Sequence, residues 1–216
     1  AIAALAYGCG AALPPVDLLC GPGNKRVTAA KSIVSGVCGI DMPAGPSEVL
    51  VIADNTCDPV IIAADLLAQA EHDVVARPIL VATDGPATIA AVNAAVQRQL
   101  ATLPTAPVAR EAVRAGFAVA CASVDEAVAV SDRVAPEHLE VMTADATGDA
   151  AKCKHFGALF IGRAAAEVLG DYGIGPNHTL PTGGTARYAG GLSVFSFLRI
   201  RTWMRVDDTS ASQGAV

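Results

Sequence analysis

The stretch VAPEHLEV, residues 134–141, places two ionisable side chains next to each other among apolar residues. Buried polar groups cost solvation free energy unless they find partners, so Glu137 and His138 need either a chemical role or hydrogen-bond partners. Few other imidazole bases are available, because the chain has only 4 histidines. The alternative is a solvated Glu at the start of a strand, followed by a His at the core edge whose ring bonds to a backbone carbonyl.

A second candidate site lies in the stretch QAEHD, at the C-terminal end of a predicted helix. Gln69 and His72 are three residues apart, with Asp65 one turn earlier, so all three share one helix face. Such a pair can hold one metal ion, because His is the commonest nitrogen ligand in proteins. Asp171 and His178, in a later glycine-rich segment, could complete the site. The alternative is a solvated helix end whose His complements the helix dipole.

A third candidate is the turn GPGN, residues 21–24, between a predicted strand and a predicted helix. Its backbone N–H groups and the positive end of the helix suit a phosphate or a carboxamide. The turn matches neither a Walker loop nor the GxGxxG pattern, so a tight turn without any ligand is an equal alternative.

Composition narrows the class of protein. The chain has 216 residues, of which 52% are hydrophobic and 17% charged, so disorder is excluded and a large core is possible. A net charge of −6 argues against a nucleic-acid partner, and no apolar run reaches the ~18 residues of a membrane span. The 6 cysteines contain no CxxC pair, which is typical of reduced, buried thiols in the cytoplasm, with a thiol nucleophile as an open alternative.

The elements that must position these residues alternate between strands and helices. Apolar runs of strand length, spaced by helical periods, indicate an α/β fold with a doubly wound, mostly parallel sheet of Rossmann-like type. The predicted strands are 47–54, 77–84, 117–122, 138–143 and 157–162, and the predicted helices are 58–72, 85–103, 107–115, 124–133 and 164–169. Ligands of such folds bind at the carboxyl ends of the strands. Glu137 and His138 begin a strand, so topology alone does not place them in a site.

The chain divides into parts of different character. The first 46 residues predict a separate unit, with a strand at VDLLC and a helix over 25–35 after the GPGN turn, and the boundary falls in 39–47. Residues 170–192 are glycine-rich and polar, and a loop longer than about 12 residues in a compact domain is usually functional. The chain opens inside a predicted helix and has no initiator Met, so we expect an internal segment of a longer parent protein.

Five stretches occur in an order that resembles one enzyme family. They are GPGNKRV, GIDMPAGPSEVLVIAD, ADLLAQAEHD, RVAPEHLEVMTAD and GDYGIGPNHTLPTGGTAR. Together they resemble the histidinol dehydrogenase family, from residue 1 to about residue 200. The resemblance implies that 1–46 is the rear half of a smaller α/β domain. It also implies that 47–192 is the rear half of a larger Rossmann-like domain, and that 193–216 starts a C-terminal tail domain.

The resemblance implies the oxidation of L-histidinol, through L-histidinaldehyde, to L-histidine, with NAD and Zn²⁺ as cofactors. Glu137 and His138 would be the catalytic acid–base pair. His138 would accept the alcohol proton while hydride leaves to NAD, and Glu137 would activate the water that hydrates the aldehyde. The resemblance also assigns ligand contacts to single side chains. Zinc would be bound by Gln69, His72 and Asp171, the substrate would be contacted by these three together with Ser47 and His138, and NAD would be contacted by Asn24.

The chain departs from the family pattern at its end. The family's fourth zinc ligand is a His in a C-terminal tail, accompanied by a substrate-binding Glu and supplied by the partner subunit of a homodimer. No histidine follows His178 here, so we expect the segment alone to be inactive and the parent protein to be a cytoplasmic homodimer. We expect neither nucleic acid nor membrane as a partner. The alternatives are a paralogous zinc- and NAD-dependent dehydrogenase acting on another small alcohol, and a non-catalytic remnant.

Overall fold

The computed structural model describes residues 1–171, 175, 177–207 and 210, without the side chain of Asp171. Five parallel strands form the main sheet, in the spatial order β5-β4-β3-β6-β7. They are β3 (Glu48–Ala53), β4 (Arg77–Ala82), β5 (Phe117–Ala120), β6 (His138–Met142) and β7 (Ala158–Ile161). The direction of winding reverses between β3 and β6, because β4 lies on one side of β3 and β6 on the other. The predicted doubly wound α/β fold is confirmed.

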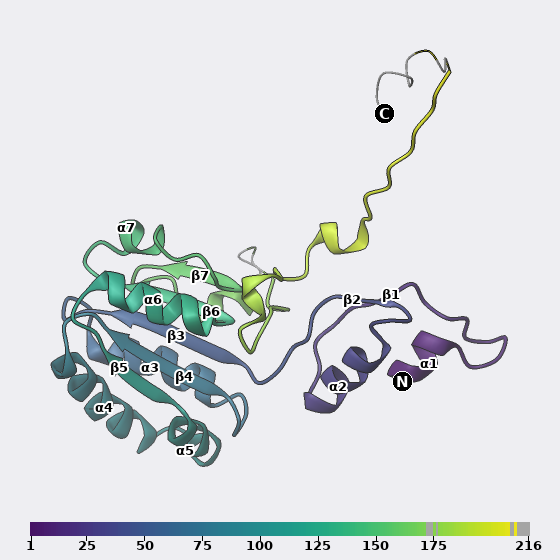
Figure 1. Cartoon of the computed structure of the whole chain (residues 1–216). Coiled ribbons are helices and arrows are strands. Elements are labelled where there is room, and N and C mark those ends of the chain that lie inside the picture. The colour runs from purple at the N-terminus through teal and green to yellow at the C-terminus, as the bar shows by residue number, and fades with distance from the viewer. Residues whose placement is uncertain (172–174, 176, 208–209, 211–216) are drawn as a thin grey trace.

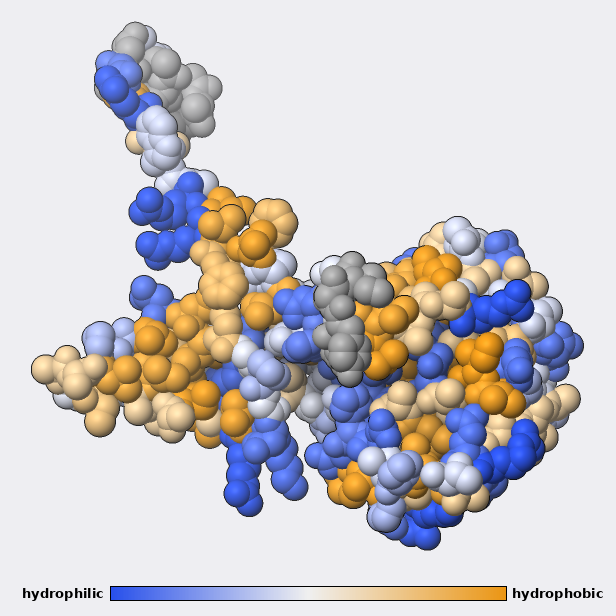
Figure 2. Space-filling model, turned by 180° about the vertical axis from the view of Figure 1, so that it is seen from behind, coloured by the Kyte–Doolittle hydropathy of each residue, from blue (hydrophilic) through white to orange (hydrophobic). Residues whose placement is uncertain are grey.

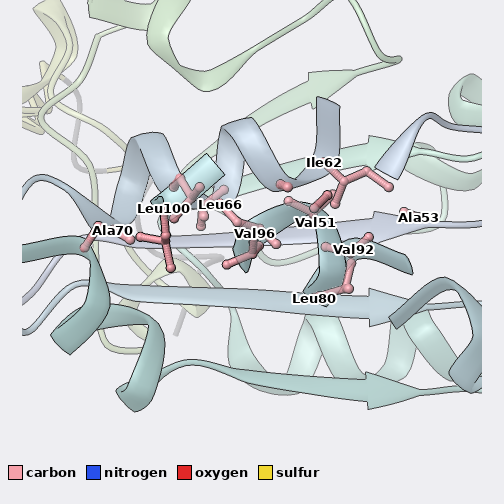
Figure 3. Close-up of a cluster of buried hydrophobic side chains, with 14 of the residues drawn as sticks. Val51, Ala53, Ile62, Leu66, Ala70, Leu80, Val92, Val96 and Leu100 are labelled. Atoms are coloured by element: carbon pink, nitrogen blue, oxygen red, sulfur yellow. The ribbon is translucent and has the colours of Figure 1, made fainter. Parts of the chain in front are cut away.

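Helices cover both faces of this sheet (Figure 1). One face packs against α3 (Pro59–Ala70), α4 (Pro86–Leu100) and α5 (Ala106–Ala115), and the other packs against α6 (Val124–Val134) and α7 (Ala146–Ala150). Alternate side chains of β3 supply the two cores, with Val49 and Val51 in the first and Leu50 and Ile52 in the second. Figure 3 shows the first core, where Val51 lies near Ile62 of α3.

The first forty residues form a second, smaller α/β unit next to the amino end of β3 (Figure 1). Helices α1 (Ile2–Tyr7) and α2 (Lys25–Val34) accompany a two-stranded parallel sheet of β1 (Leu18–Leu19) and β2 (Gly39–Ile40). The core of this unit is small, and its buried members are Ala6, Leu19, Val34 and Cys38. The predicted helix over 25–35 is confirmed. The predicted strand at VDLLC is reduced to two residues, because only those two pair with β2.

Beyond β7 the described residues have little regular structure. Three short 3₁₀ helices follow, which are η1 (Glu167–Asp171), η2 (Thr185–Arg187) and η3 (Val194–Phe197). The α-helix predicted over 164–169 is wrong, because the Glu167 N–H donates to the Glu140 carboxylate at 3.0 Å instead of starting a helical ladder. Within the glycine-rich segment 170–192, Thr179, Leu180 and Thr182 are buried, so part of the predicted loop packs against the body.

Residues 193–207 extend away from the rest of the molecule (Figure 1). Large apolar side chains are exposed there, including Phe195, Ile200 and Trp203, and Ile200 is 98% exposed. Figure 2 shows apolar surface at the base of this segment and over the small unit. No helix within the described ranges has the length and the apolar composition that crossing a membrane requires.

Candidate active site

A cavity of about 350 Å³ brings most of the predicted site residues together. Ser47, Gln69, His72, Glu137 and His138 all line it, and its size suits a small-molecule ligand. Ser47 and Glu137 immediately precede β3 and β6, so the cavity lies at the amino ends of the strands. α3 connects two parallel strands and runs back against them, which returns its C-terminal end to this same edge. The expectation that ligands bind at the carboxyl ends of the strands does not hold for this cavity.

The backbone of Glu48 holds both members of the Glu137–His138 pair. Glu137 Oε2 accepts the Glu48 N–H at 3.0 Å, and His138 Nδ1 lies 2.9 Å from the Glu48 carbonyl oxygen. The parallel pairing of β3 with β6, which sets Val49 opposite His138, brings these groups together. Glu137 is 6% exposed, so a solvated Glu at the strand start is wrong. The same alternative expected the His138 ring to bond to a backbone carbonyl group, and this bond, to Glu48, is present.

The ring nitrogens of His138 have distinct roles. A carbonyl oxygen can only accept, so Nδ1 carries the hydrogen and Nε2 carries the lone pair that can take a proton. Nδ1 also lies 3.9 Å from Glu137 Oε2 and 3.7 Å from Glu167 Oε1. These carboxylates stabilise the positive charge that arises when the ring accepts a proton. Phe160 borders the ring at a centroid distance of 6.1 Å. The arrangement suits a general base.

Gln69 and His72 line the same cavity from the end of α3. Gln69 is fully buried, and neither its amide oxygen nor its amide nitrogen has a hydrogen-bond partner in the described part of the chain. A buried polar group without a partner costs about 1–3 kcal/mol, so this side chain fits a group bound in the cavity. An amide oxygen and an imidazole nitrogen can both donate to a metal, so the pair fits the metal that the resemblance implies.

The described residues contain no group of three or more His, Cys, Asp or Glu side chains that could hold a metal ion. The four-coordinate geometry that zinc prefers needs ligands beyond Gln69 and His72. Asp171, the third predicted ligand, ends η1, but its side chain lies outside the described residues. His178, which could also complete the site, does line the cavity.

Among the predicted site residues whose side chains are described, Asn24 is the one that does not line the cavity. Its side-chain oxygen caps α2 by accepting two backbone N–H groups, at 3.0 and 3.3 Å. This bond pattern is what a tight turn at a helix start requires, so the alternative for GPGN has a structural basis. Pro22 of the same turn nevertheless lines the cavity, which places the turn at its rim.

Glu167 is a site residue that the sequence patterns do not single out. It lines the cavity, is 9% exposed and faces His138. Its backbone N–H bonds to Glu140, which attaches η1 to β6. The available signal is its isolation, because Glu167 is the only acidic residue between Asp149 and Asp171 and stands in a run of small and apolar residues.

Two buried carboxyl groups adjoin this site, Glu140 on β6 and Asp65 on α3. Burial and the negative charge of Asp65 raise the pKa of Glu140 to about 8. Burial raises the pKa of Asp65 to about 6. Asp65 lies on the same side of α3 as Gln69, so it is a buried carboxyl group next to the site.

The thiols do not support nucleophilic chemistry in this cavity. Of the described residues that line it, none is a cysteine. All six cysteines are free, and the expectation of buried thiols holds for Cys38, Cys57, Cys121 and Cys153 but not for the exposed Cys9 and Cys20. At Cys153, which has lysine neighbours in sequence, burial and nearby Asp132 and Asp149 raise the pKa to about 11. This thiol stays protonated at neutral pH.

Comparison with known proteins identifies related enzymes. A family model described as Histidinol dehydrogenase matches residues 1–215. Histidinol dehydrogenase of Desulfotalea psychrophila is 48% identical over 216 residues, which are 99% of this chain and 49% of the relative. Histidinol dehydrogenase of Nitrobacter winogradskyi is 52% identical over 200 residues, which are 92% of this chain and 46% of the relative.

A crystal structure of histidinol dehydrogenase from Elizabethkingia anophelis matches this fold with a TM-score of 0.84 and 41% sequence identity. The match covers 90% of this chain and 45% of that one. The chain thus spans about half the length of the curated relatives and of the solved structure.

Proposed function

Because this chain belongs to the histidinol dehydrogenase family, we propose that it supplies the acid–base pair and part of the metal site of an NAD-dependent, zinc-requiring enzyme. The reaction is the oxidation of L-histidinol, through L-histidinaldehyde, to L-histidine. The observation that carries the proposal is a single cavity lined by Glu137, His138, Gln69 and His72. The activity is assigned to the parent protein, since the chain spans about half of its relatives.

His138 acts as the base in both oxidations. Its Nδ1–H donates to the Glu48 carbonyl oxygen, so Nε2 accepts the proton of the substrate hydroxyl group as the hydride departs. The imidazolium that forms lies 3.9 Å from Glu137 Oε2 and 3.7 Å from Glu167 Oε1. Both carboxylates are already in place before the proton moves, which lowers the free energy of the charged state.

Glu137 acts between the two oxidations. An aldehyde must add water before it can lose a second hydride, and the Glu137 carboxylate takes the proton of that water. Its bond to the Glu48 N–H, at 3.0 Å, keeps the carboxylate beside His138. The first oxidation needs no water, so the roles of the two residues are separable.

The cofactors use other side chains of the same region. Gln69 and His72 would hold a zinc ion through the amide oxygen and an imidazole nitrogen, with Asp171 as a third ligand. Zinc held there would act as a template for the amino and imidazole nitrogens of the substrate, and NAD would be the acceptor of the hydride. Ser47, at the cavity wall, would contact the substrate. Asn24 would contact NAD through its amide NH₂ group, because its oxygen caps α2.

A partner chain completes the site in this proposal. The fourth zinc ligand, a histidine, and a substrate-binding glutamate are assigned to the C-terminal tail of a second subunit in a homodimer. The exposed apolar side chains after residue 192 support a role of that segment in subunit contact. The enzyme would be cytoplasmic, with histidinol as its small-molecule substrate and with neither nucleic acid nor membrane as a partner.

NADH formation by the parent protein tests this function. We expect NADH with histidinol and not with small alcohols that lack the imidazole and amino groups. The activity should disappear after chelation and return when zinc is added back. NADH formed from another alcohol but not from histidinol would assign the protein to a paralogous activity. No NADH from any alcohol, with no bound zinc, would identify a non-catalytic remnant.

A further inference from the structure

A buried ion pair in the small unit holds Gly21, the first residue of the turn 21–24 that leads to the cavity. Lys31 of α2 and Asp41, which follows β2, form an ion pair, and their side chains are 4% and 0% exposed. Lys31 Nζ also donates to the Gly21 carbonyl oxygen at 3.0 Å. The Gly21 N–H donates to Asp41 Oδ2 at 2.7 Å. The pair therefore holds Gly21 through both of its backbone polar groups.

Gly21 controls the start of the turn 21–24. Its φ of 131° is a conformation that residues with side chains rarely adopt, so the path of the chain at this point is unusual and needs fixed partners. The next residue, Pro22, lines the cavity. A change in how Gly21 is held would therefore be transmitted directly to the cavity wall.

The contacts of Asp41 specifically require a carboxylate. Oδ2 accepts the Gly21 N–H, while Oδ1 accepts the Met42 N–H at 2.7 Å and pairs with Lys31. An amide in its place would accept on one side and present a donor to an N–H on the other. Two apolar side chains of the same size would fill the volume but would hold neither polar group of Gly21.

The same region is joined to the body around the cavity. The Thr28 hydroxyl of α2 donates to the Ala44 carbonyl oxygen, and the Gly45 N–H donates to the Thr182 hydroxyl oxygen. Thr182 belongs to the buried part of the glycine-rich segment, and Leu180 of that part lines the cavity. The ion pair, the turn and the cavity rim are thus connected through these hydrogen bonds and the short stretches of chain between them.

We propose that Lys31 and Asp41 are a positioning pair, which holds the turn 21–24 at the cavity and thereby sets the affinity of the site for the dinucleotide. The inference rests on the proposed function, which places the NAD contact at Asn24 in this turn. Neither Lys31 nor Asp41 is among the described residues that line the cavity. Both therefore act through Gly21 and not by touching a ligand.

Kinetics of Lys31→Met and Asp41→Asn in the parent protein test the pair. Lys31→Met keeps the aliphatic chain and removes the donors. We expect the KM for NAD to rise at least about tenfold, with kcat and the KM for histidinol within about twofold, because the change displaces one binding contact and not the reacting groups. Lys152→Met is the control. It removes a lysine that lies away from the cavity and pairs with Asp149 at a distance of 3.2 Å. It should leave all three constants unchanged.

Hydrogen exchange gives a readout that does not depend on activity. The Gly21 amide should exchange at least about tenfold faster in Asp41→Asn, while the amides of β3 and β6 keep their protection. An equal loss of protection in the small unit and the main sheet would mean general destabilisation and would overturn the positioning role. Unchanged Gly21 exchange together with an unchanged KM for NAD would overturn it as well.

A second variant covers the case in which Lys31→Met does not fold. The double variant Lys31→Met/Asp41→Leu leaves no buried charge unpaired. It then takes the place of Lys31→Met in the same assays. Native zinc content with a normal KM for NAD in this double variant would contradict the proposal. If the unsubstituted parent protein forms no NADH from histidinol, the proposed function fails, whereas exchange at Gly21 still tests the pair. The two failures are therefore distinguishable.

Discussion

Glu48 orients the Glu137–His138 pair through its main chain, by one N–H and one carbonyl group. Main-chain groups remain when a neighbouring side chain is substituted. One member of the pair can therefore be changed while the other keeps its anchor. This separation makes the individual roles of the carboxylate and the imidazole measurable.

Glu137→Gln in the parent protein should slow the second half-reaction far more than the first. Glutamine keeps the size of the side chain and an oxygen for the Glu48 N–H, but it cannot accept a proton. Oxidation of supplied histidinaldehyde should fall by about 10²–10⁴-fold. Single-turnover conversion of histidinol to the aldehyde should fall much less, because Glu167 still faces the His138 ring in the variant. His138→Asn should depress both half-reactions. If Glu137→Gln slows both steps equally, Glu137 only orients His138 and does not activate water.

His72→Ala in the parent protein should remove zinc, because it deletes the imidazole at the end of α3, and the other ligands proposed in this chain, Gln69 and Asp171, bind through oxygen. Elemental analysis of the purified variant measures the loss. His155→Ala is the control, since His155 is not among the described residues that line the cavity, and its zinc content should be unchanged. Stoichiometric zinc in His72→Ala would refute the ligand assignment.

Glu140→Gln should change how the stability of the chain depends on pH. The carboxyl group has an ordinary pKa of 4.5 in the unfolded state, and burial and Asp65 raise it to about 8 in the folded state. Between these values the folded state binds more protons than the unfolded state, so the free energy of unfolding falls as pH rises through this window. Glutamine does not titrate, so the variant should lose this slope.

Urea unfolding of the metal-free parent protein measures the effect. From about pH 5 to about pH 8 the unsubstituted protein should lose roughly 3–4 kcal/mol more stability than Glu140→Gln. Glu111→Gln, at an exposed helix position, is the control and should follow the unsubstituted chain. Parallel pH profiles for Glu140→Gln and the unsubstituted chain would show that Glu140 is ionised in the fold.

Among the elements, β7 begins in close contact with the backbone of Glu137. Gly157 precedes β7, and a Cβ atom there would lie 2.5 Å from the Glu137 carbonyl oxygen. Real side chains do not reach this distance, so Gly157→Ala must shift the backbone of Glu137. We expect a loss of about 1–3 kcal/mol of stability, typical of overpacking, and a fall in kcat of the parent protein.

Gly116→Ala is the matched control for this prediction. Gly116 precedes β5 at the opposite edge of the sheet, and a Cβ atom there would lie 2.5 Å from the Pro78 carbonyl oxygen. Its stability, measured by urea unfolding, should fall by a similar amount, while kcat at a permissive temperature stays normal. Equal effects of both variants on kcat would mean that activity reports only stability and not the position of Glu137.

For the whole molecule, the segment after residue 192 dominates the expected solution behaviour. Its exposed apolar side chains have no cover in the described structure, and Phe195, Ile200 and Trp203 are each at least 75% exposed. Such surface favours association, so the isolated chain should self-associate or aggregate. A chain truncated after Leu192 should be closer to monomeric by light scattering at the same concentration. A monodisperse monomer of the full 216-residue chain would contradict this prediction.

Local patterns in the sequence determined the element types of the main sheet and most of the candidate site. Strand-length apolar runs and helical periods depend on residues a few positions apart, and they predicted all five strands of the main sheet. The motif resemblance predicted Ser47, Gln69, His72, Glu137 and His138, which do share one cavity. Local patterns failed where a distant contact overrides them, as in η1, whose first N–H bonds to Glu140 on β6.

Only the tertiary structure decided that the site lies at the amino ends of the strands. The contacts that orient Glu137 and His138 join residues 89 and 90 positions apart in the chain, through the pairing of β3 with β6. Periodicity identifies a strand but does not state its neighbours or which end faces a cavity. The same limit hid Glu167 and the Lys31–Asp41 pair, because burial and hydrogen bonding between distant segments give those residues their roles.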